Sequence, residues 1–380
     1  MIYFNIIILI FLLSFLTILI WNLLIIKRGK NITNTLYEYP SVSILIPMRN
    51  EELNAERCLT SLLSLDYPKY EIIVLNDDSE DKTAEILSNF INNKKIKILE
   101  NHYLPEGWIG KNYACKILSE HATGNYLLFS DADTVHNPQS LKKIIEYSKL
   151  TNTDLLSVIP KQELISLSEK LLVPLLYFIL FVFLPMFMLK NNRFPKFSAS
   201  IGQYLLFKRS AYEKIGGHLS VKSSIIEDIH LARRIKENNL KLSLLDGVDL
   251  ISCRMYSNMN EIINGFSKNI SAGIGNSLSI LITMSIINIL LFVYPFVGIF
   301  IHLFYQIFDY TIFYLLLTQI FVIYIMRFLL YVRFKQSFFS ILLHPFGILM
   351  MSILAIRSFY LTVFCGKANW KNRNYKIKNL

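Results

Sequence analysis

The sequence has 380 residues, of which 53% are hydrophobic and only 18% charged, and its formal net charge is +11. This composition excludes a disordered chain and is poorly suited to an ordinary soluble enzyme. Charged residues are absent from four long runs, at 2–26, 171–189, 269–308 and 336–356. Because a bilayer span needs roughly 20 mostly apolar residues, several of these runs predict membrane helices. The charged residues gather between them, which predicts a globular domain inserted among membrane segments.

The positive charge does not indicate nucleic acid, because the sequence has no zinc-finger spacing, no recognition-helix pattern and no basic stripe interleaved with aromatic residues. Lys and Arg instead favour the cytoplasmic side of membrane proteins and the anionic lipid surface there. The four cysteines are scattered, which argues against a disulfide framework and fits a reducing compartment. We therefore expect a cell-membrane protein with no nucleic-acid partner.

Residues 1–26 predict an uncleaved transmembrane anchor. The run has no basic segment before it and no small-residue cleavage site, so it does not resemble a signal peptide. Lys27, Arg28 and Lys30 follow at once, and basic residues favour the cytoplasmic side. We expect the globular domain, residues 27–276, to lie in the cytoplasm.

The run at 171–189 contains Pro174 and Pro185, and its hydropathy alone would predict a spanning helix. Motifs on both sides of it, however, are expected to form one active site. A single crossing would put those motifs on opposite faces of the membrane. We therefore expect an interfacial or re-entrant segment, with a plain spanning helix as the alternative.

A C-terminal membrane domain is expected at residues 277–366, with candidate spans at 278–303, 311–332 and 338–364. If all three crossed, the basic tail at 367–380 would lie outside, against the positive-inside rule. We favour a last segment that dips into the membrane and returns, which keeps the tail inside.

The middle of the chain alternates apolar, β-branched runs with helical patterns. The predicted strands lie at 42–46, 71–75, 96–99, 126–129 and 154–159. Strands that alternate with helices predict βαβ units and a mainly parallel sheet, which is an α/β fold. Ligands of such sheets bind at the carboxyl ends of the strands, and the acidic clusters of this sequence lie there.

Asp131 and Asp133 follow an apolar strand directly. Carboxylates at i and i+2 lie on one side of an extended segment, so the pair could bind one hard divalent cation that neutralises a diphosphate. The alternative is a pair of solvated turn residues, since Asp-x-Asp is common by chance. His218 could be a third ligand, although an ordinary polar loop histidine is the simpler interpretation.

Two further acidic positions have both a chemical and a structural interpretation. Asp77 and Asp78 close the second strand, where a carboxylate could accept a hydrogen bond from an imide N–H such as that of uracil, or where the turn only caps a helix. Glu227 and Asp228 open a helical segment, where an acid either caps the helix or acts as a general base toward a hydroxyl. Lys111 begins another helix and either meets a phosphate or is an ordinary surface lysine.

In this order, the segments 42–52, 76–83, 131–133 and 227–228 resemble the motifs of family 2 glycosyltransferases of GT-A fold, over about residues 41–240. The resemblance implies that Asp77 binds uracil, that Asp131 and Asp133 hold Mg²⁺ or Mn²⁺ on the diphosphate, and that Asp228 is the base of an inverting displacement. It also implies a substrate-binding set that further includes Pro47, Asn50, Glu51, Lys111, Asp131 and Glu227. Asn76 and Asp78 stand where the family often has Asp and Gly, which leaves the Asp77 match intact.

Further segments resemble those of bacterial carotenoid-acid glycosyltransferases of the 4,4'-diaponeurosporenoate type and of hopanoid-associated glycosyltransferases. They lie at 108–112, 216–218, 254–256, 265–269 and 370–375. Phe266 and Asn372 depart from this pattern, where Trp and Gly are usual. The Gln-x-x-Arg-Trp motif of processive synthases is absent, so polymerisation is not expected. The resemblance implies a UDP-sugar donor, with glucose as the expected sugar, and a carotenoid or other hydrophobic lipid acceptor.

The chemistry of the acceptor leaves a conflict. An alcohol needs a base, whereas a carboxylic acid, with a pKa near 4, is already ionised at neutral pH. Asp228 therefore favours an alcohol, while the subgroup resemblance favours a carotenoid acid. Diacylglycerol, a sterol-like lipid or a polyprenyl phosphate are alternative acceptors.

Two other classes of protein stay open at this point. In a transporter subunit we would expect more ionisable residues inside the spans than this sequence has. An inactive sugar-nucleotide-binding scaffold would not need Asp131, Asp133 and Asp228 together.

Overall fold

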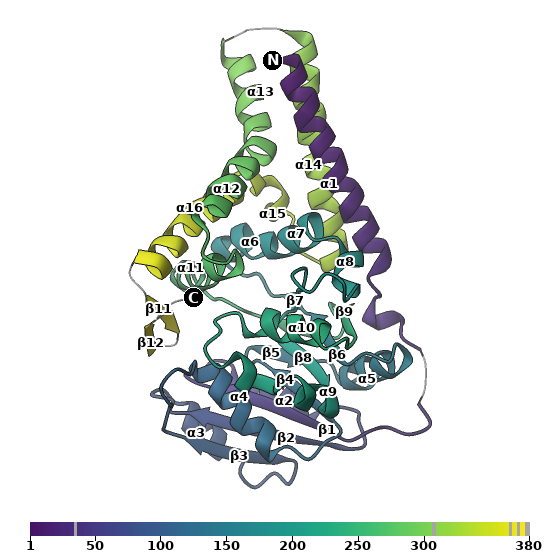
Figure 1. Cartoon of the computed structure of the whole chain (residues 1–380), viewed down its shortest axis with the longest axis vertical. Coiled ribbons are helices and arrows are strands. Elements are labelled where there is room, and N and C mark those ends of the chain that lie inside the picture. The colour runs from purple at the N-terminus through teal and green to yellow at the C-terminus, as the bar shows by residue number, and fades with distance from the viewer. Residues whose placement is uncertain (34–35, 306–308, 365–366, 371–372, 377–380) are drawn as a thin grey trace. The chain divides into compact units, whose positions relative to one another are not determined.

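The computed structural model describes residues 1–33, 36–305, 309–364, 367–370 and 373–376 (Figure 1). The chain forms two compact units. The α/β unit comprises Ile26–Glu163 and Met186–Met255, and the helical unit comprises Met1–Ile25, Leu164–Pro185 and Tyr256–Leu380. This division differs from the expected globular domain at 27–276. The residues 164–185 and 256–276 form helices that pack with the other apolar helices. The helix Pro174–Phe183 is apolar throughout, and the helix Met259–Gly273 buries Ile262 and Phe266.

A seven-stranded sheet forms the centre of the α/β unit, in the order β3-β2-β1-β4-β8-β6-β9. All pairings are parallel except those of β8, which runs antiparallel to β4 and β6. The mainly parallel sheet and all five predicted strands are thereby confirmed. The strands are β1 Val42–Met48, β2 Tyr70–Asp77, β3 Ile96–Asn101, β4 Tyr126–Ser130, β6 Leu155–Ile159, β8 Tyr204–Lys208 and β9 Leu242–Asp246.

Apart from the edge strand β3, which is partly exposed, the strands of this sheet are largely buried on both faces, as continuous apolar runs require in a parallel sheet. Ile44, Leu45 and Ile46 of β1, for example, are completely buried. The covering helices are α2 Ala55–Leu63, α3 Thr83–Ser88, α4 Gly110–His121, α5 Ser140–Leu150, α8 Met186–Lys190, α9 Arg209–Lys214 and α10 Glu227–Glu237. Two 3₁₀ turns, η1 Gly29–Asn31 and η2 Gly217–Val221, and a small sheet of β5 Thr134–His136, β10 Ile251–Cys253 and β7 Lys161–Gln162 complete the unit.

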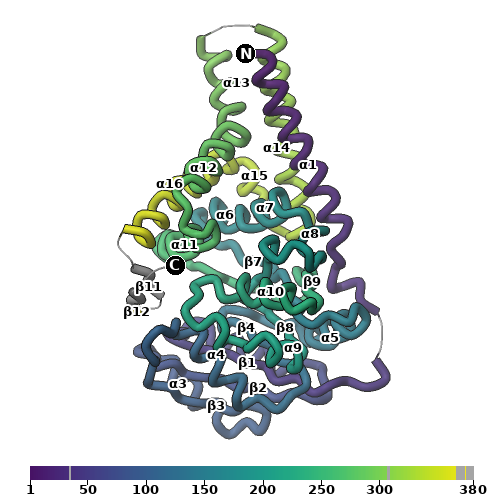
Figure 2. The backbone as a smooth tube through the Cα atoms, viewed as in Figure 1, coloured from purple at the N-terminus to yellow at the C-terminus, as the bar shows by residue number. Residues whose placement is uncertain are grey.

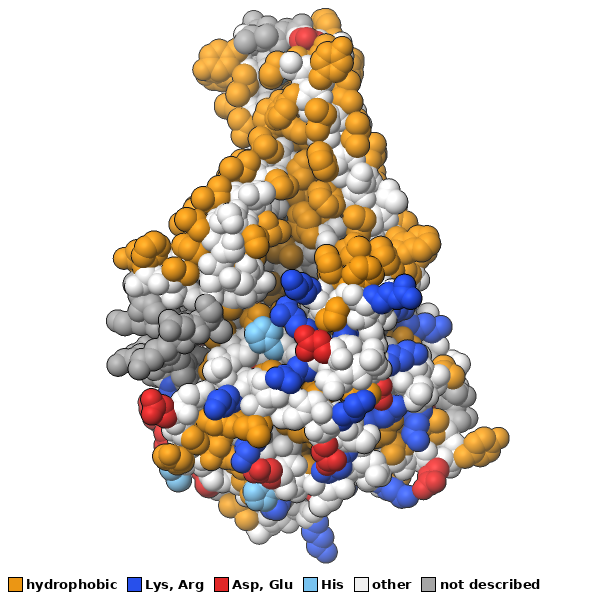
Figure 3. Space-filling model, in the orientation of Figure 1, with side chains coloured by type: hydrophobic (Ala, Val, Ile, Leu, Met, Phe, Trp, Pro, Cys, Tyr) orange, Lys and Arg blue, Asp and Glu red, His pale blue; other side chains and the backbone are white. Residues whose placement is uncertain are grey.

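The helical unit exposes much of its apolar surface, whereas charged side chains gather on the α/β unit (Figure 3). Within it, α1 and α14 run side by side (Figure 2). Its elements are α1 Ile2–Ile25, α6 Leu167–Leu172, α7 Pro174–Phe183, α11 Met259–Gly273, α12 Leu278–Phe292, α13 Tyr294–Tyr305, α14 Tyr310–Phe334, α15 Phe339–Leu342, α16 His344–Phe359, the π-helical turn η3 Tyr360–Phe364 and the hairpin β11 Lys367–Trp370 with β12 Arg373–Lys376.

Three helices in the described part of the chain are long and apolar enough to cross a membrane: α1, α14 and α16 extended by η3. The bent pair α11 and α12, with an angle of 114° between them, would make a fourth if it acts as one span. Helical segments of this length indicate membrane association. They confirm the N-terminal and C-terminal apolar helices that the sequence predicts.

Two predicted spans are each divided into two helices in the structure. The expected span at 278–303 is broken at Val293 into α12 and α13, because Pro295 lacks an N–H donor and its ring disrupts the preceding turn. The segment at 338–364 forms α15 and then, from His344, a helix that continues to Phe364. Pro345 is accommodated in the first turn, where no N–H is needed. Whether this segment crosses the membrane or dips in and returns stays a prediction.

The run at 171–189 forms parts of three short helices, α6, α7 and α8, none of which is long enough to span. Asn22 of α1 holds the end of α7, since its Nδ2 donates to the carbonyls of Phe181 and Leu184 at 2.8 Å each. The interfacial or re-entrant placement of this segment stays a prediction. Of the predicted basic tail, residues 371–372 and 377–380 lie outside the described residues.

Candidate functional site

Asp77 ends β2 at the carboxyl edge of the sheet, where it is paired in register with Asn101 at the end of β3. Its side chain is almost completely buried, and Oδ1 accepts a hydrogen bond from Asn101 Nδ2 at 2.8 Å. A carboxylate that is held this way has a fixed direction. The structure thus places Asp77 where the parallel fold puts ligand-binding groups.

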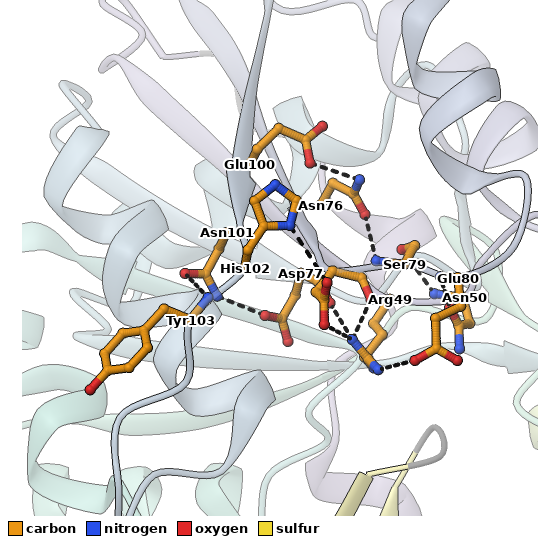
Figure 4. A network of polar contacts seen from close by, with 11 residues as sticks. Arg49, Asn50, Asn76, Asp77, Ser79, Glu80, Glu100, Asn101, His102 and Tyr103 are labelled. Atoms are coloured by element: carbon orange, nitrogen blue, oxygen red, sulfur yellow. Dashed lines mark hydrogen bonds and ion pairs between the residues drawn. The ribbon is translucent and has the colours of Figure 1, made fainter.

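Arg49 organises the turn that follows Asp77 (Figure 4). Its buried guanidinium donates through Nη1 to the main-chain oxygens of Asp77, at 2.8 Å, and of Asp78. Nη2 donates to Glu80 Oε1 at 3.0 Å. Asp78 adopts a left-handed conformation with φ of 56°, so this turn is held against its own backbone preference.

Asn50 and Glu51 also support this turn. Asn50 Oδ1 accepts from the Glu80 amide at 2.8 Å, and the Asn50 amide donates to Ser79 Oγ at 3.1 Å. The Glu51 amide donates to Thr83 Oγ1 at 2.7 Å. The loop after β1 therefore fixes the loop after β2 through a set of polar contacts.

The Asp131–Asp133 turn follows β4 and rests on a buried hydroxyl. Thr134 Oγ1 donates to the Asp131 carbonyl at 2.7 Å and lies 2.7 Å from Ser130 Oγ. His136 Nε2 lies 3.2 Å from both hydroxyl oxygens. This network fixes the backbone between the two carboxylates.

One of the two carboxylate oxygens of Asp133 is unsatisfied. Its Oδ1 is buried and has no hydrogen-bond partner among the described residues. Burial, together with the charges of Asp131 and Glu51, raises the pKa of Asp133 to about 8. An oxygen with these properties is a natural ligand for a cation.

Lys111, in the first turn of α4, joins two acidic segments. Its Nζ lies 2.8 Å from Asp131 Oδ1 and 3.1 Å from Glu227 Oε1. Burial opposes its charge, but the Asp131 and Glu227 carboxylates outweigh this effect and hold the pKa of Lys111 well above its ordinary value. These three side chains line a small cavity of about 10 Å³, together with Pro47 and His218.

Asp228 lies in the first turn of α10, where its Oδ1 accepts from the Ile229 amide at 2.8 Å. Burial and the neighbouring Glu227 carboxylate raise the pKa of Asp228 to about 7. A Cβ atom on Gly202 would lie 3.4 Å from Asp228 Oδ2, so the chain before β8 passes close to this carboxylate. A carboxylate with this pKa suits a general base at neutral pH.

A buried lysine anchors the segment that leads to Gly202. Lys236 Nζ donates to the carbonyls of Met188, Phe194 and Phe197 at 2.7 to 2.9 Å. At its other end, the Asp131 amide donates to the Gln203 carbonyl at 3.4 Å. The segment between α8 and β8 is therefore fixed at both ends.

Sequence reasoning gave no role to Arg49 or Asn112. Asn112 is completely buried, and its Nδ2 donates to the carbonyls of Val221, Lys222 and Ser224 at 2.9 to 3.2 Å. These bonds tie α4 to the loop that leads into Glu227. Both residues lie inside the motif segments, at 42–52 and 108–112, but no residue pattern there indicated their roles.

His218 is buried against aromatic rings. Its Nδ1 lies 2.8 Å from the Tyr212 hydroxyl, and its ring centroid lies 4.6 Å from that of Phe129. Both contacts are structural, which agrees with the simpler interpretation of this histidine, although it is buried and not on a polar loop.

Across the described residues, no group of three or more His, Cys, Asp or Glu side chains is arranged to hold a metal ion. Asp131 and Asp133 offer two carboxylates, and Oδ1 of Asp133 is buried without a hydrogen-bond partner among the described residues. Hard divalent cations take six or more oxygen ligands, which a diphosphate and water could complete. The two residues therefore fit a metal that binds together with a nucleotide.

Comparison with known proteins adds independent findings. Residues 43–216 match the family model described as Glycosyl transferase family 2. The chain is 31% identical over 244 residues to the 4,4'-diaponeurosporenoate glycosyltransferase of Staphylococcus haemolyticus, a match that covers 61% of this chain and 62% of that protein. It is 25% identical over 364 residues to the protein of the same name from Staphylococcus aureus strain N315, with 92% of each chain covered.

A solved structure shares the fold. It is a mannosyltransferase from Pyrobaculum calidifontis in complex with GDP-Man and Mn²⁺, with 14% sequence identity and a TM-score of 0.54. The match covers 95% of this chain and 99% of that one. At this identity the likeness shows the fold alone.

Proposed function

Given that this chain is a family 2 glycosyltransferase, we propose that it transfers a sugar from a UDP-sugar to a carotenoid acid or related hydrophobic lipid of the membrane. The observation that carries the proposal is that Lys111 pairs with Asp131 and Glu227, beside Asp228, at the carboxyl edge of the sheet where Asp77 also lies. A sugar nucleotide needs a group for its base, a cationic site for its diphosphate and a group beside the acceptor. The residues named offer one of each.

Asp77 would accept a hydrogen bond from the imide N–H of uracil. A buried carboxylate oriented by Asn101 is suited to this contact, because an unpaired imide N–H would be costly to bury. Guanine also carries a ring N–H of this kind. Uridine and guanosine donors must therefore be compared in the assay.

Asp131 and Asp133 would hold Mg²⁺ or Mn²⁺, and a metal bound there would neutralise the charge of the departing diphosphate. The turn fixed by Thr134 keeps both carboxylates at the end of β4. Pro47, Lys111 and Glu227 surround the same space, and Lys111 supplies the positive charge for a phosphate.

Asp228 would take the proton of an acceptor hydroxyl while the sugar is attacked from the side opposite the diphosphate, which inverts the anomeric carbon. The raised pKa of Asp228 supports this role, since a base with a pKa near 7 is partly ionised and still basic at neutral pH. A carboxylate acceptor would attack without it.

The acceptor follows from the relatives. Both staphylococcal proteins carry the name of a diaponeurosporenoate glycosyltransferase. The match spans 62% of the Staphylococcus haemolyticus protein, so the activity of that whole protein stays a proposal for this chain. A second acceptor class, lipid alcohols such as diacylglycerol, is favoured by the presence of a base at Asp228. The phosphate of a polyprenyl lipid is already ionised and would attack without a base.

The apolar helices would hold the enzyme in the cell membrane as a multi-pass protein, with the α/β unit in the cytoplasm, where UDP-sugars are made. The cluster Lys27, Arg28 and Lys30 directly after α1 supports this orientation.

The test is sugar transfer into the lipid phase. Membranes with the protein receive labelled UDP-glucose or GDP-mannose, Mn²⁺ and either a carotenoid acid or diacylglycerol. Label from UDP-glucose in the carotenoid that is lost with Asp133→Asn supports the proposal. Asp154→Asn, which removes an acid paired with Lys208 at 3.0 Å, is the matched control and should keep activity. Label from GDP-mannose alone, or none with any lipid, would contradict it.

A further inference from the structure

The ammonium of Lys111 forms an ion pair with a carboxylate that the proposed metal also needs. It lies 2.8 Å from Asp131 Oδ1 and 3.1 Å from Glu227 Oε1. Two cations a few ångströms apart in a partly buried site repel each other strongly. The metal and Lys111 therefore compete for the charge of Asp131.

The space between these three side chains is small. The cavity that Lys111, Asp131 and Glu227 line has a volume of about 10 Å³, which is room for about one water molecule. A metal ion can take the position between Asp131 and Glu227 only if the ammonium leaves it. Lysine has a flexible four-carbon stem, so the ammonium can swing while Lys111 keeps its place at the start of α4.

Removal of the ammonium would leave a strongly acidic site. The carboxylates of Asp131, Glu227, Asp133 and Asp228 influence one another electrostatically, and Lys111 is paired with the first two. An acidic cluster without this lysine would attract divalent cations in the absence of a donor.

We propose that Lys111 holds the place of the metal in the donor-free enzyme and moves to the diphosphate when donor and metal bind together. This inference rests on the proposed function and deepens it. Free metal then binds weakly, and donor and metal strengthen each other's binding by the same factor, as linkage requires. Lys111 acts here as a positioning residue for both ligands.

The test measures metal binding directly. The full chain, purified in detergent, is titrated with Mn²⁺ without nucleotide, and free Mn²⁺ is followed by electron paramagnetic resonance. For Lys111→Gln we expect Mn²⁺ to bind about tenfold tighter or more than in the wild type, because a competing charge has gone. In the same variant, UDP in the presence of Mn²⁺ should bind about tenfold more weakly, because a phosphate-binding cation has gone. A role of Lys111 in folding alone would not produce these opposite changes.

Three further variants sharpen the result. Lys116→Gln removes a lysine of the same helix that pairs with Glu120 at 2.9 Å, and it should change neither affinity. Lys111→Arg keeps the charge and should keep the weak binding of free Mn²⁺. Lys111→Gln combined with Glu227→Gln removes one charge of each sign, so it serves if the single variant does not fold, and it should still bind free Mn²⁺ more tightly than the wild type.

An unchanged or weaker Mn²⁺ affinity in a folded Lys111→Gln variant, with UDP still bound by the wild type, would overturn the role of Lys111 and leave the proposed function standing. A wild-type protein that binds neither UDP nor Mn²⁺ would overturn both.

Discussion

Arg49 Nη1 donates to the main-chain oxygen of Asp77 at 2.8 Å, from a side chain that is only 3% exposed. The arginine thus holds the backbone of the residue proposed to read the base of the donor. Its charge is balanced by Asp78 and Glu80, which are much more exposed. The contact links the ends of β1 and β2.

We expect Arg49→Met to lower the free energy of unfolding by about 2 kcal/mol, since it removes hydrogen bonds from a charged donor to buried carbonyls. The KM for the donor should rise about tenfold, with a smaller effect on kcat, because the turn at Asp77 loosens. Arg57→Met is the matched control, because Arg57 forms a half-exposed pair with Glu163 and should cost less than about 1 kcal/mol. Thermal unfolding and donor titrations check both values. An unchanged donor KM would show that Arg49 serves stability alone.

Asp133→Asn should separate activity from stability. We expect transfer to fall at least about a hundredfold, because one of two metal-binding carboxylates is lost. The donor-free variant should nevertheless unfold at a higher temperature than the wild type at pH 7, because the wild-type carboxyl must take up a proton when it is buried, whereas the amide is already neutral. Calorimetry and initial rates test the two parts, and a lower unfolding temperature would contradict the second.

The raised pKa of Asp133 also predicts how the stability of the protein depends on pH. Because the pKa of Asp133 is raised from its ordinary value to about 8, the folded state binds more protons than the unfolded state between about pH 4 and pH 8. The free energy of unfolding of the donor-free enzyme should therefore decrease as the pH rises from 4 to 8. Below pH 4, Asp133 is protonated in both states and does not lower the stability. Asp133→Asn should flatten this decline. An equal slope in wild type and variant would show that other groups cause it.

Asp228 predicts a pH profile that distinguishes the acceptors. With an alcohol acceptor, kcat/KM should fall about tenfold per pH unit below pH 7, because the base becomes protonated. With a carotenoid acid, the acceptor stays ionised down to a pH of about 4, so this limb should be absent and Asp228→Asn should retain activity. Rates measured between pH 5 and pH 8 with both acceptors decide the matter. A limb near pH 7 with the acid acceptor would show that Asp228 acts in another way.

Asn112→Ala should disturb the site from a distance. The variant loses the hydrogen bonds to Val221, Lys222 and Ser224, and we expect about 2 kcal/mol less stability. We also expect a lower kcat, because the loop that leads to Glu227 and Asp228 is held less firmly to α4. Asn92→Ala, at an exposed position, is the control. Stability lost without any change in kcat would contradict the link.

The sequence was sufficient to predict the five strands of the α/β unit whose apolar runs are long and end at turns. It was not sufficient for β8 and β9. Tyr204–Lys208 resembles many short apolar runs, and only its pairing with β4 and β6 makes it a strand. The membrane segments show a similar limit. Residues 278–303 are apolar enough for one span, but the break at Val293 depends on where Pro295 falls in the helix.

The candidate site was predictable to a similar degree. Asp77, Asp131 and Asp133 end parallel strands, and parallel strands bring their carboxyl ends to one edge. The contact of Lys111 with Asp131 and Glu227 joins residues 20 and 116 positions away along the chain, which no local pattern encodes. Arg49 and Asn112 were missed because their partners are main-chain carbonyls, which leave no trace in the residue types around them.

The reversed direction of β8 has a consequence for how this enzyme can diverge. An antiparallel strand starts where its neighbours finish, so the segment from Lys190 to Gly202 arrives beside Asp228 from outside the βαβ framework that carries Asp77 and Asp131. Lys236 fastens that segment by its carbonyls and not by its side chains. Its sequence can therefore be exchanged to suit a new acceptor while the donor half of the site is inherited unchanged.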